Sequence, residues 1–495
     1  MRLTLLLVLL SGLVACDGTK PGSSAPSDAG VGADADVGTD AAGSSIERMS
    51  LEQLQDPETC KSCHPKQYAE WSRSMHAYAS LDPVFIAMNQ RGQRETNGTL
   101  GKFCVQCHAP MAVNKKLTTD GLNLASLPKS VQGVTCYFCH NTSGVGTDHF
   151  NANLTLANDT TMRGSIKDAH DPGVHAVAYS AAHDSFKMDS SYLCGTCHDV
   201  VNQRGTHIER TLEEYKGSFA SLERNSLAKG GDSCQGCHMR AKDTDYIADV
   251  PSTFGLKKRP LHDHSAAAVD VALSDDFGDA GTRALQRQAT EYALTLGGFV
   301  FEVVNDGLGD FRITIETNAG HKQPSGTAQD RRMWLEVIAY DAQNNVLFQS
   351  GVIGDQEVEE YDPTDARYDP QLCNFRERFF DDAGIETHDF WEAATVVPNK
   401  VLPTAVDLQI PHTVLCEYRT PGHQQPARLT MRMLVRPVGM DVLQDLIDSG
   451  DLDAAVKAKM PTFQVQNTVI EWTADQGPAQ PTMPQSKLPP LYPPP

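Results

Sequence analysis

Five copies of one short motif constrain this chain more than any other feature. Each copy reads Cys-x-x-Cys-His, and all five lie in the 205 residues from Cys60 to His264. That leaves about 41 residues per motif, which is too little chain to enclose five separate apolar cores. We therefore expect groups other than side chains to fill much of the interior of this stretch.

The spacing within each motif fits covalent attachment of haem c. Two thiols three positions apart can form thioethers to the two vinyl groups of a haem, and the adjoining histidine can reach the iron. The predicted thioether residues are Cys60, Cys63, Cys104, Cys107, Cys136, Cys139, Cys194, Cys197, Cys234 and Cys237. The predicted proximal iron ligands are His64, His108, His140, His198 and His238. The motifs thus predict five haems c as cofactors.

Zinc sites and disulfides are the competing interpretations of paired cysteines. Tetrahedral zinc needs two Cys-x-x-Cys pairs per site, so an odd number of pairs fits poorly, and zinc gives no reason for a histidine after every second cysteine. Disulfides within such pairs are strained and redox-active, and five in one exported chain would be unusual. Haem is the favoured interpretation.

The N-terminus has the pattern of a bacterial export signal. Arg2 precedes an apolar run from Leu3 to Leu10, and Leu13-Val14-Ala15-Cys16 resembles a lipobox. We expect residues 1–15 to be a lipoprotein signal peptide and Cys16 to be lipidated, with an ordinary signal peptide as the alternative. This predicts a membrane contact through a lipid anchor and a location at the cell envelope, periplasmic or on the outer membrane or cell surface.

The charge balance restricts the partners. The chain has 42 Lys and Arg against 63 Asp and Glu, for a net charge of −21. A negative field repels nucleic acid and favours basic redox partner proteins, although solubility alone also explains such a balance.

Composition changes along the chain predict an α+β multidomain protein. We expect a disordered tether at 16–50, a mostly helical and loop haem domain at 51–265, a connecting helix at 266–298, an immunoglobulin-like β-sandwich at 299–475 and a disordered Pro-rich tail at 476–495. Alternating runs such as 299–304, 311–316 and 334–340 predict the sandwich strands, and Gln343-Asn344-Asn345 predicts a hairpin turn. A helix is expected at 442–459 and a last strand at 465–472.

Several segments resemble the multihaem cytochrome c superfamily, in particular the cytochrome c-552/c-554 type. They are Trp71 to His76, Cys104-Val-Gln-Cys-His-Ala-Pro, Gly133 to Cys136, Cys234-Gln-Gly-Cys-His-Met, His262-Asp-His264 and Gly320 to Gly326. The resemblance covers roughly Cys60 to Ser350. It implies a largely helical domain with closely spaced haems and an electron-transfer role. Pentahaem nitrite reductases carry Lys after one Cys pair, whereas all five pairs here precede His, which weakens an enzymatic reading.

Six further histidines are candidate distal ligands of the irons: His76, His175, His183, His262, His264 and His321. His76 sits on a predicted helix that begins at Pro65, about 18 Å beyond His64 if that helix is continuous, so it should face a neighbouring haem. We expect one of His262 and His264 to ligate. His321 lies on a Gly- and Pro-rich loop of the sandwich, and we predict that it ligates a haem of the other domain. We expect His388, His412 and His423 to be surface or turn residues.

Two cysteines remain outside the motifs and the lipobox. Cys373 and Cys416 both fall in the predicted exported sandwich, where an oxidising compartment favours a disulfide.

The sequence favours electron transfer over catalysis, with all five irons low-spin and six-coordinate. The alternative is a reductase of nitrite, hydroxylamine or a sulfur oxyanion, which would need one open iron with charged residues nearby. A third interpretation makes the sandwich a docking module for a partner. Enzymatic activity therefore stays open.

Overall fold

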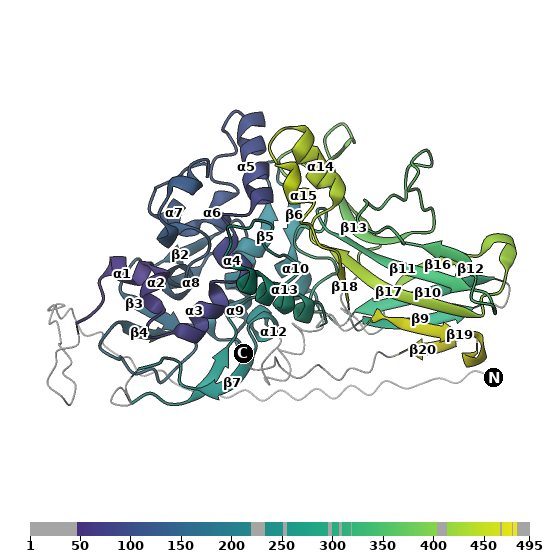
Figure 1. The fold of residues 1–495 in the computed structure, drawn as a ribbon. Coiled ribbons are helices and arrows are strands. Elements are labelled where there is room, and N and C mark those ends of the chain that lie inside the picture. Colours follow the sequence, from purple (N-terminus) through teal and green to yellow (C-terminus); the bar gives the residue numbers. More distant parts are fainter. Residues whose placement is uncertain are drawn as a thin grey trace, which may run out of the picture.

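The computed structural model describes residues 47–218, 233–250, 255–295, 299–305, 309–317, 319–402, 413–465, 468–477 and 479–482. Short helices and small sheets form the N-terminal half, and two larger sheets form most of the C-terminal half (Figure 1). The mixed helical and sheet architecture agrees with the fold class expected from the sequence. Cys16, His412 and most of the predicted tether lie outside the described residues. Within the described ranges, every helix is too short or too polar to cross a membrane.

The N-terminal half is built from short helices with well-formed N-termini. Ser50 caps the first helix in a capping box with Gln53, and Asp82 caps the longest helix of this half, which starts at Pro83. The helices are α1 (Leu51–Gln55), α2 (Pro57–Cys60), α3 (Pro65–Trp71), α4 (Met75–Tyr78), α5 (Pro83–Glu95), α6 (Val105–His108), α7 (Pro110–Asn114), α8 (Cys136–Asn141), α9 (Met188–His198), α10 (Thr211–Lys216) and α12 (Cys234–His238).

The predicted continuous helix through His76 is wrong. The chain leaves the helix after Trp71, and Ser74 caps a new helical turn, α4, by accepting a hydrogen bond from the backbone N–H of Ala77. A serine favours such a cap because its hydroxyl satisfies an N–H that has no intrahelical partner.

Four two-stranded sheets connect these helices, although the sequence indicated few strands here. The antiparallel pairs are β1 (Thr142–Val145) with β2 (Leu154–Leu156), β5 (Asp199–Val201) with β6 (His207–Arg210), and β7 (Ala241–Asp245) with β8 (Arg259–His262). Strands β3 (Thr161–Gly164) and β4 (Ala176–Tyr179) run parallel. Short 3-10 turns include Leu124–Ser126, Lys129–Val131 and Ala181–His183.

Two sheets pack face to face in the C-terminal half. One has the order β16-β10-β9-β20, and the other runs β14-β13-β11-β17-β18, with β12, β15 and β19 paired to its members. The strands are β9 (Phe299–Asn305), β10 (Asp310–Thr317), β11 (Arg332–Tyr340), β12 (Val346–Ser350), β13 (Cys373–Phe380), β14 (Glu386–Thr387), β15 (Thr395–Asn399), β16 (Val414–Arg419), β17 (Arg428–Arg436), β18 (Phe463–Gln464), β19 (Ile470–Thr473) and β20 (Ala479–Thr482).

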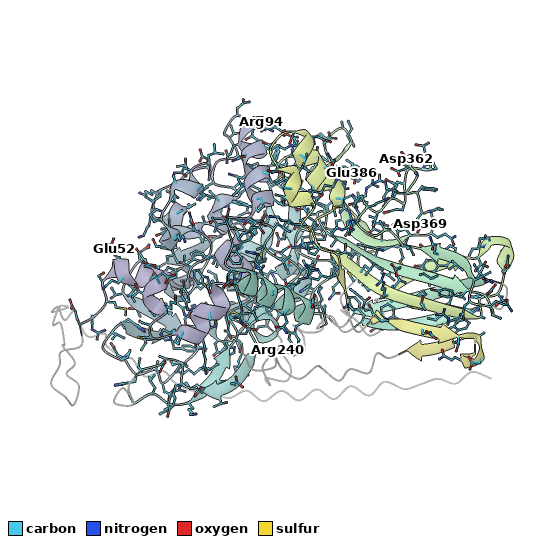
Figure 2. All side chains as sticks on the ribbon, viewed as in Figure 1. Glu52, Arg94, Arg240, Asp362, Asp369 and Glu386 are labelled. Atoms are coloured by element: carbon cyan, nitrogen blue, oxygen red, sulfur yellow. A yellow bond between two sulfur atoms is a disulfide. The ribbon has the colours of Figure 1, made fainter. Side chains whose placement is uncertain are left out.

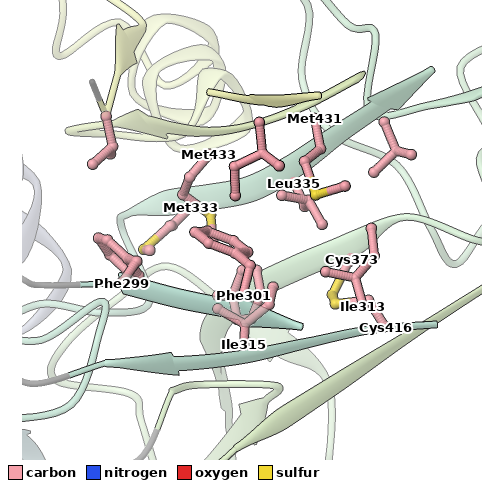
Figure 3. Close-up of a cluster of buried hydrophobic side chains, with 14 of the residues drawn as sticks. Phe299, Phe301, Ile313, Ile315, Met333, Leu335, Cys373, Cys416, Met431 and Met433 are labelled. Carbon is pink, nitrogen blue, oxygen red and sulfur yellow. A yellow bond between two sulfur atoms is a disulfide. The ribbon is translucent and has the colours of Figure 1, made fainter. Parts of the chain in front are cut away.

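Alternation along the strands sends apolar side chains from both sheets into one core. Phe301 and Ile313 on one sheet meet Leu335 and Met431 on the other (Figure 3). The Sγ atoms of Cys373 on β13 and Cys416 on β16 are bonded, so a disulfide joins the two sheets. Strands β11 and β12 form the hairpin that the turn residues predicted, with Tyr340 opposite Val346.

Three C-terminal elements differ from the sequence prediction. The expected helix at 442–459 divides into α14 (Met440–Asp448) and α15 (Ala454–Lys457), because Gly450 takes a left-handed conformation with φ of 80°. The expected strand at 465–472 is confirmed only at its end, where β19 begins at Ile470, while the short strand β18 ends before residue 465. The predicted tail at 476–495 includes β20, which pairs with β9 and so extends the sheet beyond residue 475.

The two halves share buried apolar clusters. Helix α5 packs against α14, with Met88 and Leu100 on one side, Leu443 on the other and Trp391 between them. Arg94 lies near the end of α5 (Figure 2). It donates a hydrogen bond of 2.7 Å to Asp451 just beyond α14. Connecting helix α13 spans Ala280–Thr295, and the segment before it contributes Val269 to the sandwich core. The connection is therefore part of the packed structure.

Candidate functional site

Helical turns hold each Cys-x-x-Cys-His motif in a compact local form. In α8 and α12 the whole motif lies in one short helix, capped by Thr135 and Ser233 respectively. Residues three and four positions apart share a helix face, so the two thiols and the histidine of a motif point to the same side. The local sequence therefore sets the arrangement of the three side chains at each attachment site.

All five motifs open onto one cavity of about 2250 Å³. Its lining includes all ten motif cysteines, the five proximal histidines and all six distal candidates. A single small ligand occupies roughly 300–1,000 Å³, so this space is sized for several large groups. Among the described residues, no three His, Cys, Asp or Glu side chains form a group that could hold a metal ion.

Contacts at the Nδ1 atoms hold the proximal histidines in an orientation that suits an iron ligand. Four donate Nδ1–H to backbone carbonyl oxygens: His64 to Ile247 at 2.8 Å, His108 to Ala79 at 3.0 Å, His140 to Arg163 at 2.7 Å and His238 to Ala267 at 3.1 Å. The fifth, His198, places Nδ1 3.4 Å from a carboxylate oxygen of Glu209. Engaging Nδ1 leaves Nε2 available to a metal and holds the ring in one orientation. These residues therefore fit haem.

Four imidazole pairs have the separation that a shared iron requires. Metal–imidazole bonds of about 2 Å on both sides put two ring centroids roughly 6 Å apart. The observed centroid distances are 6.5 Å for His64 and His175, 6.4 Å for His198 and His76, 6.3 Å for His140 and His264, and 6.2 Å for His238 and His321. The structure thus places four of the six distal candidates opposite proximal histidines, and each partner comes from outside the motif it faces.

The other two candidates occupy supporting positions. His183 stacks on His140 with centroids 5.4 Å apart and donates Nε2–H to the carbonyl oxygen of Cys139 at 2.8 Å, which places it beside the proximal ligand. His262 donates Nδ1–H to the carbonyl oxygen of Met239 at 2.7 Å. Of the pair His262 and His264, the structure brings His264 opposite a proximal histidine.

The ring of His108 faces an aromatic side chain, unlike the four proximal histidines that face another histidine. Its ring stacks on Phe85 with centroids 4.0 Å apart, and no histidine in the described part of the chain forms a ring contact with it. Among the described residues, four proximal histidines thus face a second histidine ring, and His108 faces the ring of Phe85.

Charged side chains line the cavity, and two carboxylates among them act on His108. Arg331 forms a bidentate ion pair with Asp270, with distances of 2.7 and 2.9 Å. Burial lowers the pKa of His108, and the carboxylates of Glu209 and Asp270 act in the opposite direction, so both lie within electrostatic range. Burial also raises the pKa of Asp82 to about 6 and that of Asp330 to about 7. Sequence reasoning missed all of these residues because isolated Asp, Glu and Arg carry no recognisable spacing.

Cysteines of different motifs lie near one another. The thiols of Cys60 and Cys136, of Cys107 and Cys197, and of Cys194 and Cys234 are close enough to shift the pKa of each other. The first motif is thus a neighbour of the third, the second of the fourth, and the fourth of the fifth.

One predicted surface histidine is partly buried instead. His388 lies between the carboxylates of Asp441 and Asp445, at 3.6 and 3.4 Å, and its side chain is 18% exposed. The expectation of a surface position is wrong because α14 covers this loop. His423 lies in a turn beside Asp310, as expected.

Comparisons with known proteins agree with this site. Residues 59–141 match the family described as cytochrome c554 and c-prime. The crystal structure of a penta-heme cytochrome c552 from Thermochromatium tepidum has a TM-score of 0.55 and 19% sequence identity to this chain, covering 85% of this chain and 99% of that one. No curated protein gives a significant match. The resemblance inferred from the motifs is confirmed: residues 59–141 match this cytochrome family, and the fold is similar to that of a penta-heme cytochrome c552.

Proposed function

We propose that this protein carries five covalently attached haems c and passes electrons through them to redox partner proteins. The observation that carries the proposal is the convergence of all five motifs on one cavity, where thiols of neighbouring motifs are close enough to shift the pKa of each other. Each bound haem would supply a one-electron iron couple. Because the cysteines mark the haem edges, attachment sites that line one cavity support short distances between those edges.

The histidine pairs support a carrier role at four of the motifs. Two imidazoles fill both axial positions of an iron, which leaves no position for substrate. The hydrogen bonds from Nδ1 to the protein hold each proximal ring in place and limit reorganisation when an electron arrives.

Haem counting and spin state test this proposal. Protein produced in a host with cytochrome c maturation should give five haems per chain by pyridine haemochrome, retained after acid-acetone extraction. Electron paramagnetic resonance of the oxidised protein should show mainly low-spin signals. Fewer than five covalent haems, or zinc by elemental analysis, would overturn it.

His108 favours a second candidate function, a reductase of nitrite, hydroxylamine or a sulfur oxyanion. Among the described residues, the ring facing His108 is that of Phe85 and not an imidazole, and Arg331 pairs with Asp270, a carboxylate that acts on the pKa of His108. Asp82 and Asp330, with pKa values near neutrality, are suited to donate protons that such reductions consume.

Carbon monoxide binding distinguishes the two functions. The reductase candidate predicts that the reduced protein binds carbon monoxide at one haem and turns over nitrite or hydroxylamine. Arg331→Gln should then lower turnover by about tenfold or more, whereas Arg94→Gln at the surface should not. No carbon monoxide binding and no turnover would leave the carrier role alone.

The remaining proposals concern location and the sandwich. We propose that lipidated Cys16 anchors the protein at the cell envelope. Labelling with a radioactive fatty acid tests this anchor, since Cys16→Ser should abolish both the label and membrane fractionation.

We also propose that the immunoglobulin-like sandwich docks a partner. Pull-down of basic redox proteins by the full chain tests this docking role.

A further inference from the structure

The loop that carries His321 is held by residues that follow the fourth motif. This loop, Gly320–Gly326, connects β10 to β11 at the end of the sandwich nearest the cavity. Helix α10 lies against it and comes from the other half of the chain, shortly after His198. The two segments are therefore joined across the interface between the halves.

Two side chains of α10 make the contacts. Glu214 accepts hydrogen bonds from the hydroxyl of Ser325 at 2.7 Å and from the backbone N–H of Lys322 at 3.2 Å, and its other oxygen lies 3.8 Å from the Lys322 ammonium. Thr211 accepts from the backbone N–H of Gly326 at 3.1 Å, while its hydroxyl lies 3.1 Å from that of Ser325. These contacts bind the loop on the C-terminal side of His321.

Burial of the Glu214 carboxylate costs free energy, because the charged group loses its hydration. This cost indicates that the contacts of Glu214 with the loop matter to the structure. The Glu214 side chain is 9% exposed, and a buried carboxylate is tolerated only where donors compensate for lost hydration. All of the contacts named above come from the His321 loop. The loop therefore supplies the main compensation, and Glu214 in turn determines where the loop lies.

Helix α10 is itself fixed to the fourth motif. Leu212 is buried and packs on Gly195, where an added Cβ would lie 2.2 Å from a Leu212 methyl carbon. The backbone N–H of Leu212 donates to Asp199, the residue after His198, at 3.1 Å. A continuous path of packed and hydrogen-bonded groups thus leads from the fourth motif to the His321 loop.

We propose that Glu214 is a positioning residue that holds His321 opposite His238, so that α10 couples the fifth haem site to the fourth. This inference rests on the proposed function, in which His321 ligates the haem of the fifth motif. It adds that ligation depends on a carboxylate that touches neither the iron nor its two histidines.

Glu214→Ala tests the role directly. The partly buried N–H of Lys322 would lose its acceptor, the Ser325 hydroxyl would keep only its contact with Thr211, and the loop should shift to find water. We expect loss of one low-spin haem signal in electron paramagnetic resonance, replaced by a high-spin or altered low-spin signal, with four haems unchanged. Glu214→Gln keeps one acceptor oxygen and should restore much of the signal. The control Glu213→Ala, on the same helix but 60% exposed and paired with His207, should leave the spectrum unchanged.

A parallel His321→Ala variant distinguishes the positioning role of Glu214 from ligation by His321. If His321→Ala changes one haem and Glu214→Ala changes none, ligation stands and the positioning role is overturned. If His321→Ala leaves all five haems unchanged, ligation fails and this inference fails with it. If Glu214→Ala does not fold, Thr211→Ala serves in its place, because it removes the acceptor for the Gly326 N–H. We expect Thr211→Ala to perturb the same haem signal as His321→Ala. An unchanged spectrum would overturn the proposal.

Discussion

A carboxylate oxygen of Glu209 lies 3.4 Å from Nδ1 of His198, whereas the other four proximal histidines donate Nδ1–H to backbone carbonyl oxygens. A carboxylate partner makes an imidazole a more basic ligand than a carbonyl partner does. A more basic axial ligand stabilises the ferric form of the iron. The proximal histidine of the fourth motif therefore differs from the other four in having a negatively charged partner at Nδ1.

Glu209→Gln should therefore raise the midpoint potential of one haem. The amide keeps the shape and a hydrogen-bond acceptor but removes the negative charge, so the ferric form loses stabilisation. Spectropotentiometric titration of the oxidised and reduced protein measures the shift. Glu213→Gln is the matched control and should leave all potentials in place. Identical titration curves for Glu209→Gln and the parent protein would contradict the prediction.

The ion pairs of His388 should make stability depend on pH. Burial by itself lowers the pKa of His388, but hydrogen bonds to Asp441 and Asp445 outweigh this effect and raise the pKa to about 9. A histidine whose pKa is higher in the folded state stabilises the fold fully below its unfolded pKa of about 6.5, and this contribution is lost as the pH rises through about 9. Asp441 also pairs with the buried Arg332, and Asp445 with Arg91 of α5, so the effect reaches the interface between the halves.

We expect His388→Gln to lower the free energy of unfolding by roughly 1–3 kcal/mol at pH 6 and by little at pH 10. Denaturant titrations at the two pH values measure this difference. His423→Gln, a histidine that is 57% exposed beside Asp310, serves as the control and should have little effect at either pH. Equal destabilisation by His388→Gln at both pH values would show that its charge is not involved.

Gly92 is predicted to be a packing position that accepts no larger residue. A Cβ added there would lie 2.6 Å from a Leu100 methyl carbon and 2.7 Å from the Trp391 ring. Gly92→Ala should therefore destabilise the contact between α5 and the C-terminal half by about 1–3 kcal/mol, although alanine favours helix. Thermal unfolding measures the loss, and Gln90→Ala on the exposed face of α5 is the control. A stabilised Gly92→Ala variant would mean that Trp391 can move away without cost.

The disulfide between Cys373 and Cys416 should stabilise the sandwich through the unfolded chain. It closes a loop with a sequence separation of 43 residues and links the two sheets. Replacing both cysteines with alanine should lower the free energy of unfolding by about 2–4 kcal/mol. Mass spectrometry without reduction should find the two peptides joined. Two free thiols in the mature protein would remove the basis of this prediction.

The attachment sites could be predicted from the sequence because each is local. Two cysteines and a histidine within five residues share one helical turn, so their chemistry needs no knowledge of the fold. The hairpin of β11 and β12 was predictable for the same reason, since alternating strands flank a polar turn. Local reasoning failed where one residue redirects the chain, as Ser74 does before α4 and Gly450 does after α14.

The sequence named the candidate opposing histidines, but it could not assign each to the proximal histidine that it faces. His76 faces His198 and His321 faces His238, and in both cases the partners lie on separate elements that only the packed chain brings together. The same holds for Glu209, Glu214 and Arg331, which have no motif and acquire their roles from burial and from the charges beside them. Covalent attachment depends on spacing along the chain, which the sequence states directly. Axial ligation, charge near the irons and contact between haem sites depend on distances in space, and these are set only when the two halves pack against each other.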